Sequence, residues 1–125
     1  MAYSPVGRGW LTGEFRKLDD LPQNDFRRMM PRFKPEVFDQ NFKLVEAVEQ
    51  IAKRKGVTTA QVAIGWVSSQ GAIPILGSTK IERVVQNSKV VPLTNEDMAE
   101  IQKNLETLPI AGERYGGANE RLLNA

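Results

Sequence analysis

Two kinds of hydrophobic spacing alternate along the chain, and together they predict strands and helices in a repeating order. Short apolar runs at residues 2–6 and 72–76 predict two strands, each ending in a turn rich in glycine, serine or proline. Apolar residues three and four positions apart predict helices over residues 41–55, 58–71, 80–88 and 95–107. A strand, then helices, then a strand, then helices is typical of parallel strands joined by right-handed crossovers.

Polar residues at the predicted helix ends support these boundaries. Gly56 follows the first helix, where a left-handed C-terminal cap is expected. The pairs Thr58–Gln61 and Thr79–Glu82 have the spacing of capping boxes for the second and third helices. Thr94 is the expected cap of the fourth helix.

The remaining segments have no clear period. Residues 7–40 contain scattered glycines, prolines and charges, which predicts a long irregular excursion. Within this segment, Trp10 either contacts a ligand or packs in the core. Residues 109–125 are predicted to form an extended tail.

The composition is that of an ordinary globular chain, and it removes several classes of chemistry. The 125 residues are 41% hydrophobic and 26% charged, with a net charge of +2. There is no cysteine and no histidine, which excludes disulfides, a thiolate nucleophile and the commonest general base and metal ligand. Positive residues are interspersed with acids, which argues against a nucleic-acid partner. The carboxylate pair Asp19–Asp20 is interpreted as solvated rather than as a metal site.

Localisation follows from what the chain lacks. No apolar run approaches the roughly 20 residues of a membrane span. The N-terminus has neither the basic start nor the apolar stretch of a signal peptide. We therefore expect a cytoplasmic protein with no membrane partner.

The turn after the second predicted strand has the residues of an anion site. Gly77 permits a close backbone approach, and Ser78, Thr79 and Lys80 place hydroxyls, N–H groups and a cation at a predicted helix start. The positive end of a helix dipole favours an anion such as phosphate there. A plain helix cap with a solvated lysine is the simpler alternative.

The helix that follows this turn adds groups suited to a nucleotide. Arg83 offers a planar guanidinium for phosphate or for stacking on a base, and Gln86 and Asn87 offer amides within reach of an adenine edge.

The turn after the first predicted strand, residues 3–9, has a complementary composition. Tyr3 can stack on a flat ring, and Ser4, Gly7 and Gly9 can line a backbone cradle for a pyrophosphate. A tight turn with Tyr3 as a core aromatic is the alternative.

Both turns resemble segments of one family. Tyr-Ser-Pro-Val-Gly-Arg-Gly-Trp-Leu-Thr-Gly at residues 3–13 resembles the seventh strand and following loop of aldo-keto reductases. Ile-Pro-Ile-Leu-Gly-Ser-Thr-Lys at residues 73–80, with Gln86-Asn87, resembles the eighth strand and the loop that binds the adenosine 2′-phosphate. Residues 31–66 and the Gly-Glu-Arg-Tyr run at 112–115 are similar to the pyridoxal-reductase-like branch.

The resemblance implies an α/β fold that is part of a (β/α)₈ TIM barrel. It corresponds to the last two βα units and the C-terminal helices, with two parallel strands and about four helices. A whole barrel needs about 250 residues, so this chain holds at most about half of one. Residues 1–125 would then be the C-terminal part of an NADP-dependent oxidoreductase domain.

The resemblance also implies an NADP (NADPH) site. The first loop would hold the nicotinamide and the pyrophosphate, and the second would hold the 2′-phosphate and the adenine. Valine stands at position 6, where family members commonly have leucine. The implied cofactor-binding residues are Tyr3, Ser4, Val6, Gly7, Arg8, Gly9, Gly77, Ser78, Thr79, Lys80, Arg83, Gln86 and Asn87.

By the same comparison the chain carries no catalytic residue. The family's catalytic aspartate, tyrosine, lysine and histidine lie on earlier strands, and Tyr115 belongs to the C-terminal motif instead. The parent reaction would be reduction of an aldehyde or ketone, with pyridoxal as one candidate. We predict that this chain alone does not catalyse it.

Three hypotheses remain open from the sequence. The chain is a truncated, inactive reductase, an NADP-binding module without catalysis, or an interaction module that pairs with a full-length reductase through open strand edges. Helix faces shaped to cover a closed barrel would be partly exposed, so we also expect marginal folding or self-association.

Overall fold

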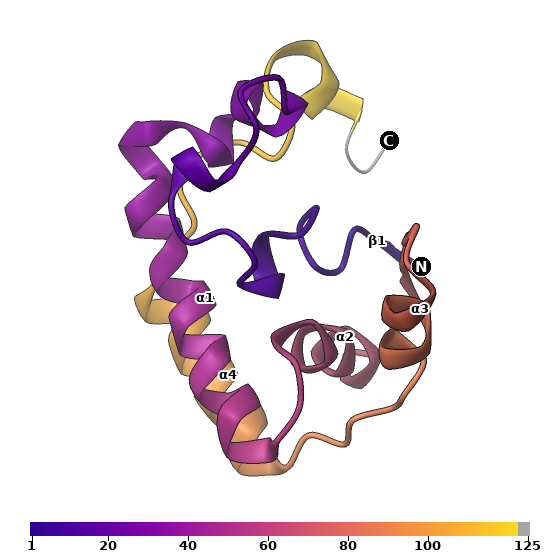
Figure 1. Cartoon of the computed structure of the whole chain (residues 1–125). Helices are drawn as coiled ribbons and strands as arrows, with labels where there is room; N and C mark the ends of the chain where they lie inside the picture. Colours follow the sequence, from indigo (N-terminus) through magenta and orange to yellow (C-terminus); the bar gives the residue numbers. More distant parts are fainter. Residues whose placement is uncertain (123–125) are drawn as a thin grey trace.

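The computed structural model describes residues 1–122 and contains, within that range, two short parallel strands and four α-helices (Figure 1). The predicted α/β class and the numbers of strands and helices are therefore confirmed. The elements are β1 (Ala2–Tyr3), α1 (Pro35–Lys55), α2 (Thr59–Ser69), β2 (Pro74–Ile75), α3 (Ile81–Asn87) and α4 (Asn95–Thr107).

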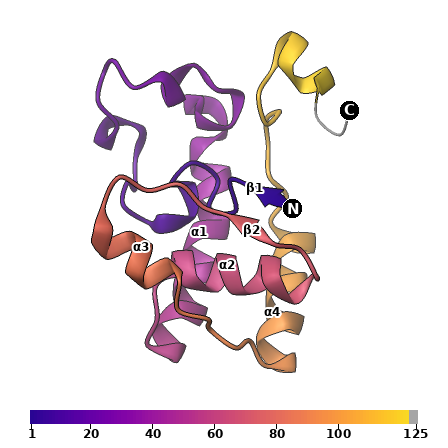
Figure 2. The same ribbon diagram turned by 90° about the vertical axis from the view of Figure 1, so that its right-hand side faces the viewer.

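The two strands pair in parallel, as predicted, with Ala2 opposite Pro74 and Tyr3 opposite Ile75. Both are shorter than the predicted runs at 2–6 and 72–76. β1 ends early because Ser4 has a φ of 50°, outside the extended region. The strand pair lies above α2 in Figure 2.

Helix α1 begins at Pro35, six residues before the predicted start at residue 41. Proline suits the first helical turn because its missing N–H has no partner there. Phe38 is buried and extends the apolar face of the helix by one turn toward its N-terminus. At the other end Gly56 has a φ of 65°, which confirms the predicted cap.

The main helical core forms where α1 meets α2 and α4. Val48 and Ile51 of α1, Val62 of α2 and Ile101 of α4 are buried in one cluster, with Trp66 packed at its border. Figure 1 shows α4 running alongside α1 over much of its length. This packing fixes α2, whose N-terminus reaches the site described below.

Two of the three predicted N-terminal helix caps are confirmed. In α2 the N–H of Gln61 donates to Thr58 Oγ1 at 3.1 Å, and in α4 the N–H of Asp97 donates to Thr94 Oγ1 at 3.1 Å. The predicted Thr79–Glu82 box is wrong, whereas the helix predicted at about 80–88 is present and is one residue shorter at each end. Lys80 takes the cap position without any side-chain hydrogen bond, because α3 begins one residue later than predicted.

The predicted irregular segment 7–40 is more ordered than its composition suggests. Besides the first turns of α1, it contains 3₁₀ turns at Trp10–Thr12, Leu18–Asp20, Phe26–Met29 and Pro31–Phe33. Trp10 is buried and meets the rings of Phe15, Phe33 and Phe38 edge-on, with centroids 5.5, 4.9 and 4.7 Å away. Trp10 therefore packs in an aromatic core.

The tail is not uniformly extended, because Gly117–Leu122 forms 3₁₀ turns; residues 123–125 of the prediction lie outside the described residues. Buried Asn41 holds the tail against α1. Its Nδ2 donates to the carbonyls of Arg32 and Ala111, and its Oδ1 accepts the N–H of Ala111 at 2.8 Å. Gly112 passes Pro31 so closely that a Cβ would lie 2.9 Å from the Pro31 carbonyl carbon.

Among residues 1–122, no helix combines the length and the hydropathy needed to cross a membrane. The same part of the chain contains no cluster of acidic side chains able to hold a metal ion.

Candidate functional site

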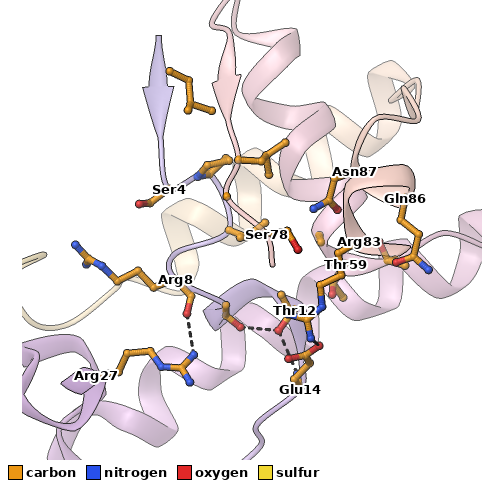
Figure 3. A pocket seen from close by; sticks show the side chains of 18 residues that line it. Ser4, Arg8, Thr12, Glu14, Arg27, Thr59, Ser78, Arg83, Gln86 and Asn87 are labelled. Atoms are coloured by element: carbon orange, nitrogen blue, oxygen red, sulfur yellow. Dashed lines mark hydrogen bonds and ion pairs between the residues drawn. The ribbon is translucent and has the colours of Figure 1, made fainter. Parts of the chain in front are cut away.

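A cavity of about 520 Å³ lies beside the carboxyl ends of β1 and β2 (Figure 3). Its walls come from the loop after β1, the loop after β2, α3 and the N-terminus of α2. Small-molecule sites typically have volumes of about 300–1,000 Å³. Ligands commonly bind at the carboxyl ends of parallel strands, so the cavity lies where a site is expected.

The loop after β1 has an unusual backbone conformation. Ser4, Gly7, Arg8 and Gly9 all have positive φ values, between 50° and 88°. For serine and arginine this conformation is strained, and such strain is typically kept by the surrounding structure at functional sites. The N–H groups of Arg8 and Gly9 form no hydrogen bond within residues 1–122. The loop can therefore offer two N–H donors to a ligand.

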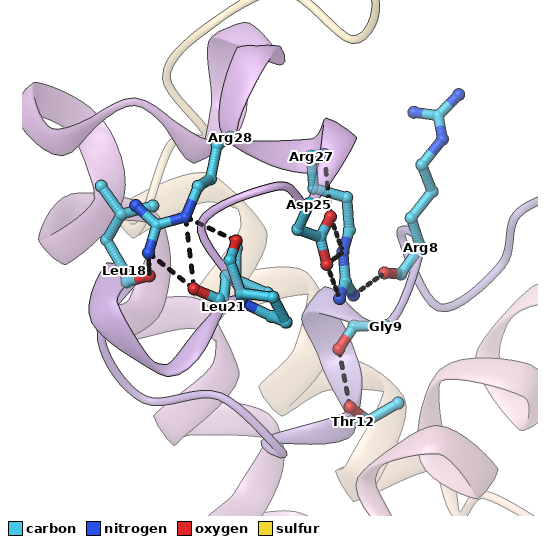
Figure 4. Close-up of polar contacts among 9 residues, drawn as sticks. Arg8, Gly9, Thr12, Leu18, Leu21, Asp25, Arg27 and Arg28 are labelled. Atoms are coloured by element: carbon cyan, nitrogen blue, oxygen red, sulfur yellow. Dashed lines mark hydrogen bonds and ion pairs between the residues drawn. The ribbon is translucent and has the colours of Figure 1, made fainter.

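Arg27 fixes this loop from the side (Figure 4). Its Nη1 donates to the Arg8 carbonyl at 3.0 Å, while its Nη2 forms an ion pair with Asp25 at 2.7 Å. Hydrogen bonds from the Arg27 guanidinium hold the pKa of Asp25 below its usual value. The pair thus stays charged at neutral pH and keeps the Arg8 carbonyl in place.

The neighbouring Arg28 organises the segment that carries Arg27. Its guanidinium donates to the carbonyls of Leu18, Leu21 and Pro22 at 2.6–3.2 Å (Figure 4). The carbonyls of Leu18 and Pro22 also accept the backbone N–H groups of Leu21 and Asp25, so Arg28 reinforces turns that the backbone already forms.

The loop after β2 brings Gly77 and Ser78 to the cavity wall. Ser78 Oγ accepts the N–H of Lys80 at 3.1 Å, which shapes the turn into α3. Thr79 and Lys80 are exposed and do not line the cavity. The predicted hydroxyl and cation cluster is therefore split, with only Ser78 on the wall.

Helix α3 presents Arg83, Gln86 and Asn87 to the same cavity. Arg83 Nη2 forms an ion pair with Glu14, which comes from the segment after the first 3₁₀ turn. The Gln86 carbonyl accepts a hydrogen bond from buried Gln61 Nε2 at 2.9 Å, and this bond ties α3 to α2. Figure 3 shows Ser78, Asn87 and Arg83 around one opening.

Tyr3 and Gly7 do not line this cavity. The ring of Tyr3 is half exposed, and the Arg114 guanidinium lies over it at 4.3 Å. The alternative of Tyr3 as a core aromatic is therefore wrong. Arg8 does line the cavity, but its guanidinium lies over the ring of Tyr115 at 4.3 Å, and Figure 3 shows its side chain extending away from Arg83.

The structure thus brings together most of the predicted cofactor-binding residues. Those on the cavity wall are Ser4, Val6, Arg8, Gly9, Gly77, Ser78, Arg83, Gln86 and Asn87. The sequence did not point to Thr12, Glu14, Arg27 or the Thr58–Ala60 turn, which line the same wall. Thr58 was visible only as a helix cap and Thr59–Ala60 only as the start of a predicted helix, whereas Thr12, Glu14 and Arg27 lie in a segment without a period.

Comparison of the sequence with known proteins identifies the family to which this site belongs. Residues 1–106 match the model of the Aldo/keto reductase family. The chain belongs to the aldo/keto reductase family.

Three curated aldo/keto reductases illustrate the relationship. The chain is 39% identical over 119 residues to an aldo-keto reductase of Gibberella moniliformis, covering 92% of this chain and 36% of that protein. It is 34% identical over 119 residues to a Schizosaccharomyces pombe protein named as an NADP(+) aldo-keto reductase, covering 92% and 35%. It is 34% identical over 129 residues to an aldo-keto reductase of Strobilurus tenacellus, covering 100% and 38%.

The chain therefore spans little more than a third of the length of these aldo/keto reductases. Two parallel strands followed by helices are consistent with part of an aldo/keto reductase barrel. The comparisons do not separate branches of the family, so the pyridoxal-reductase-like branch stays a prediction.

Proposed function

We propose that this chain is the C-terminal part of an NADPH-dependent aldo/keto reductase and forms one side of its NADP site. The observation that carries the proposal is the cavity in which the loop after β1 meets Ser78, Arg83 and Asn87. These residues come from segments about 70 positions apart in the sequence. Residues 1–125 would act as one part of an oxidoreductase domain.

The charges around the cavity suit a nucleotide that carries a 2′-phosphate. Arg83 is the cation that would pair with this phosphate. The Ser78 hydroxyl, which donates to the Lys80 carbonyl at 3.1 Å, would turn to donate to the phosphate instead. In the structure the Arg83 guanidinium is in an ion pair with the Glu14 carboxylate. A bound phosphate, which carries more negative charge, would take the place of this carboxylate. The amides of Gln86 and Asn87 would face the adenine.

The loop after β1 suits the pyrophosphate. Arg8 and Gly9 supply backbone N–H donors without a partner in the described residues, and backbone donors of this kind form typical anion cradles. The loop already has its strained conformation, so binding does not have to create it. Tyr3, at the end of β1, would lie against the nicotinamide.

When bound, NADPH supplies the hydride that reduces an aldehyde or ketone to an alcohol, and the reaction also requires an acid beside the carbonyl oxygen. The residues of this chain bind and orient the nucleotide. The chain contains no histidine, and none of its residues takes the role of that acid in this proposal. We therefore expect no carbonyl reduction by the chain alone.

Calorimetric titration of the purified chain with NADPH and with NADH tests the proposal. We expect saturable binding of NADPH, and binding of NADH weaker by at least about tenfold because it has no 2′-phosphate. Arg83→Gln should abolish this preference. Arg121→Gln, which removes an exposed arginine of the tail, is the matched control and should keep it.

Equal affinity for NADPH and NADH would reject the role of Arg83. Failure of both nucleotides to bind would reject the NADP site in this chain.

A second candidate is an interaction module for a full-length reductase. Ile73 and Ile75 are 67% and 48% exposed beside a sheet of only two strands, within the part of the chain that the structure describes. Open strand edges of this kind can pair with another chain. Mixing the chain with the Schizosaccharomyces pombe relative and measuring the mass of the eluted species tests this. A mixed species supports the candidate, and unchanged separate masses contradict it.

A further inference from the structure

A second cavity, of about 240 Å³, lies next to the first and shares Ser4, Pro5 and Arg8 with it. Three arginines line it, each from a different segment. Arg8 comes from the loop after β1, Arg32 from the 3₁₀ turn before α1, and Arg114 from the tail. Apolar side chains complete the wall, namely Trp10, Leu11, Phe33, Leu44 and Ile110.

The arginines of this cavity are not in ion pairs within the described residues. Neither Arg8, Arg32 nor Arg114 forms an ion pair with a carboxylate in residues 1–122. Burial and the positive charges of Arg114 and Arg8 lower the pKa of Arg32, although it still remains protonated in water. Three positive charges thus gather beside one cavity, and none of them is in direct contact with a carboxylate of the described residues.

Glu120, whose charge acts on Arg32, is already engaged by backbone donors. Glu120 accepts the backbone N–H groups of Arg114, Tyr115 and Gly116 at 2.7–3.2 Å. Its role is to shape the backbone that carries Arg114. An anion from solution would therefore find the three guanidinium groups free of side-chain carboxylates.

Two tyrosines and two carbonyls hold the arginines in place. Arg8 lies over the ring of Tyr115 and Arg114 over the ring of Tyr3, each at 4.3 Å. Arg114 Nη2 also donates to the Tyr3 carbonyl at 2.9 Å, and Arg32 Nε donates to the Gly112 carbonyl at 3.1 Å. A guanidinium has five N–H donors, so each arginine keeps donors for a ligand.

We propose that this cavity binds the carboxylate of an oxo-acid substrate, the three arginines holding the carboxylate and the apolar wall holding its carbon chain. The inference rests on the proposed function, because Tyr3, which touches Arg114, is the residue that we place against the nicotinamide. The planar guanidinium matches a carboxylate in geometry and charge. Inorganic phosphate would satisfy the same donors but would leave the apolar wall uncovered.

Binding of two matched ketones to the unmodified chain tests the inference. The probes are 4-oxopentanoate and 2-pentanone, which have the same length of carbon chain and differ in the carboxylate. We expect NMR titrations to show saturable binding of 4-oxopentanoate, at least about tenfold tighter than that of 2-pentanone. Its affinity should fall as salt is added, because ions screen the attraction.

Variants then locate the site and separate it from the nucleotide site. Arg32→Gln should weaken 4-oxopentanoate at least about tenfold without changing NADPH affinity. Arg83→Gln should do the reverse, and Arg121→Gln should change neither. Arg32→Lys keeps the positive charge but loses the paired N–H donors of the guanidinium, so this variant should retain only part of the affinity for 4-oxopentanoate. The comparison of the two ketones on the unmodified chain does not depend on how any variant folds.

Equal affinity for the two ketones would overturn the proposal. So would equally tight binding of inorganic phosphate in competition, which would indicate a site for any anion. If NADPH fails to bind but 4-oxopentanoate binds and Arg32→Gln weakens it, the nucleotide site is rejected and the carboxylate site stands. If NADPH binds and 4-oxopentanoate does not, only the carboxylate site is rejected.

Discussion

The side chain of Glu14 is the anion that faces Arg83 in the structure, and it comes from a segment that sequence patterns left undefined. A carboxylate beside a phosphate-binding cation has two opposite effects. It keeps the guanidinium oriented, and it competes with the ligand. Both side chains are more than a third exposed, so solvent weakens the pair and a doubly charged phosphate can displace it.

This competition gives a prediction for Glu14→Gln. Removing the carboxylate frees Arg83, so we expect NADPH affinity to rise by about two- to fivefold, consistent with the small energy of an exposed pair. The calorimetric titration measures this, with Glu46→Gln on the exposed side of α1 as the matched control. Weaker NADPH binding in the Glu14 variant would show that orientation of Arg83 matters more than competition.

Polar and charged residues that follow a predicted strand, at a predicted helix start, could be identified from the sequence as candidate ligand-binding residues. Ser78 and Arg83 were placed by their position around a predicted helix start, and both line the cavity. Arg27 and Glu14 could not be found, because tertiary contacts alone bring their segment to the cavity. Nor could the sequence show that Arg8, inside the predicted phosphate loop, would turn its guanidinium to Tyr115.

At the scale of elements, two helix starts with the same sequence pattern differ in structure. Thr94 caps α4 through a hydrogen bond from Asp97, whereas Thr79 makes no cap because Lys80 takes that position. We expect Thr94→Ala to lower the free energy of unfolding by about 1 kcal/mol. Thr79→Ala should change it by less than about 0.5 kcal/mol. Urea unfolding of both variants measures the difference, and equal losses would contradict the assignment of the caps.

Charged side chains join α1 to α4. Buried Asp97 accepts hydrogen bonds from Lys55 Nζ at 2.7 Å and from Arg54 Nη2 at 3.0 Å, and also from the N–H of Thr94. The bond from Lys55, followed by the one from Thr94, holds the pKa of Asp97 well below its usual value. Because the folded-state pKa is lowered, this carboxylate stabilises the fold at neutral pH.

We therefore expect the free energy of unfolding to fall as the pH drops below about 4, the usual pKa of an unfolded aspartate. Asp97→Asn should lose about 1–3 kcal/mol at pH 7 and should depend less on pH between 2 and 5. Urea unfolding at a series of pH values measures this. An unchanged acid dependence in the variant would assign the effect to other carboxylates.

Periodic segments could be predicted as elements, whereas their ends could not. Helix α1 was found from its apolar spacing, but its first turn was missed because Pro35 looks like a break and instead begins the helix. The strands were found from their apolar runs, and the early end of β1 depends on the positive φ of Ser4, which no local pattern shows.

At the scale of the whole molecule, several large apolar side chains are exposed outside the core. Ile73 and Ile81 are 67% and 79% exposed, and β1 and β2 have no third strand beside them within residues 1–122. We expect the chain to self-associate with rising concentration in sedimentation experiments. Ile75→Lys should weaken association at least about tenfold, whereas Val90→Lys, remote from the strands in sequence, should not. A monodisperse chain with a sharp thermal transition would contradict this.

The composition and the order of elements were enough to predict an α/β architecture. They could not predict how the tail returns to the body, because that return depends on Asn41, a single buried amide inside a helix. A polar residue on an apolar face gives no indication of its partner 70 positions away.

Docking of the tail against the body of the molecule should also be coupled to ligand binding in the cavity that contains Arg114. Gly112 fits against Pro31 with no room for a side chain, and from that point the tail carries Arg114 to a cavity whose other arginines belong to the body of the molecule. A ligand that touches both parts must stabilise their association, and by thermodynamic reciprocity a loosened tail must release the ligand. Resistance of the tail to proteolysis would then report occupancy of the cavity, so a limited digestion could replace a direct measurement of binding.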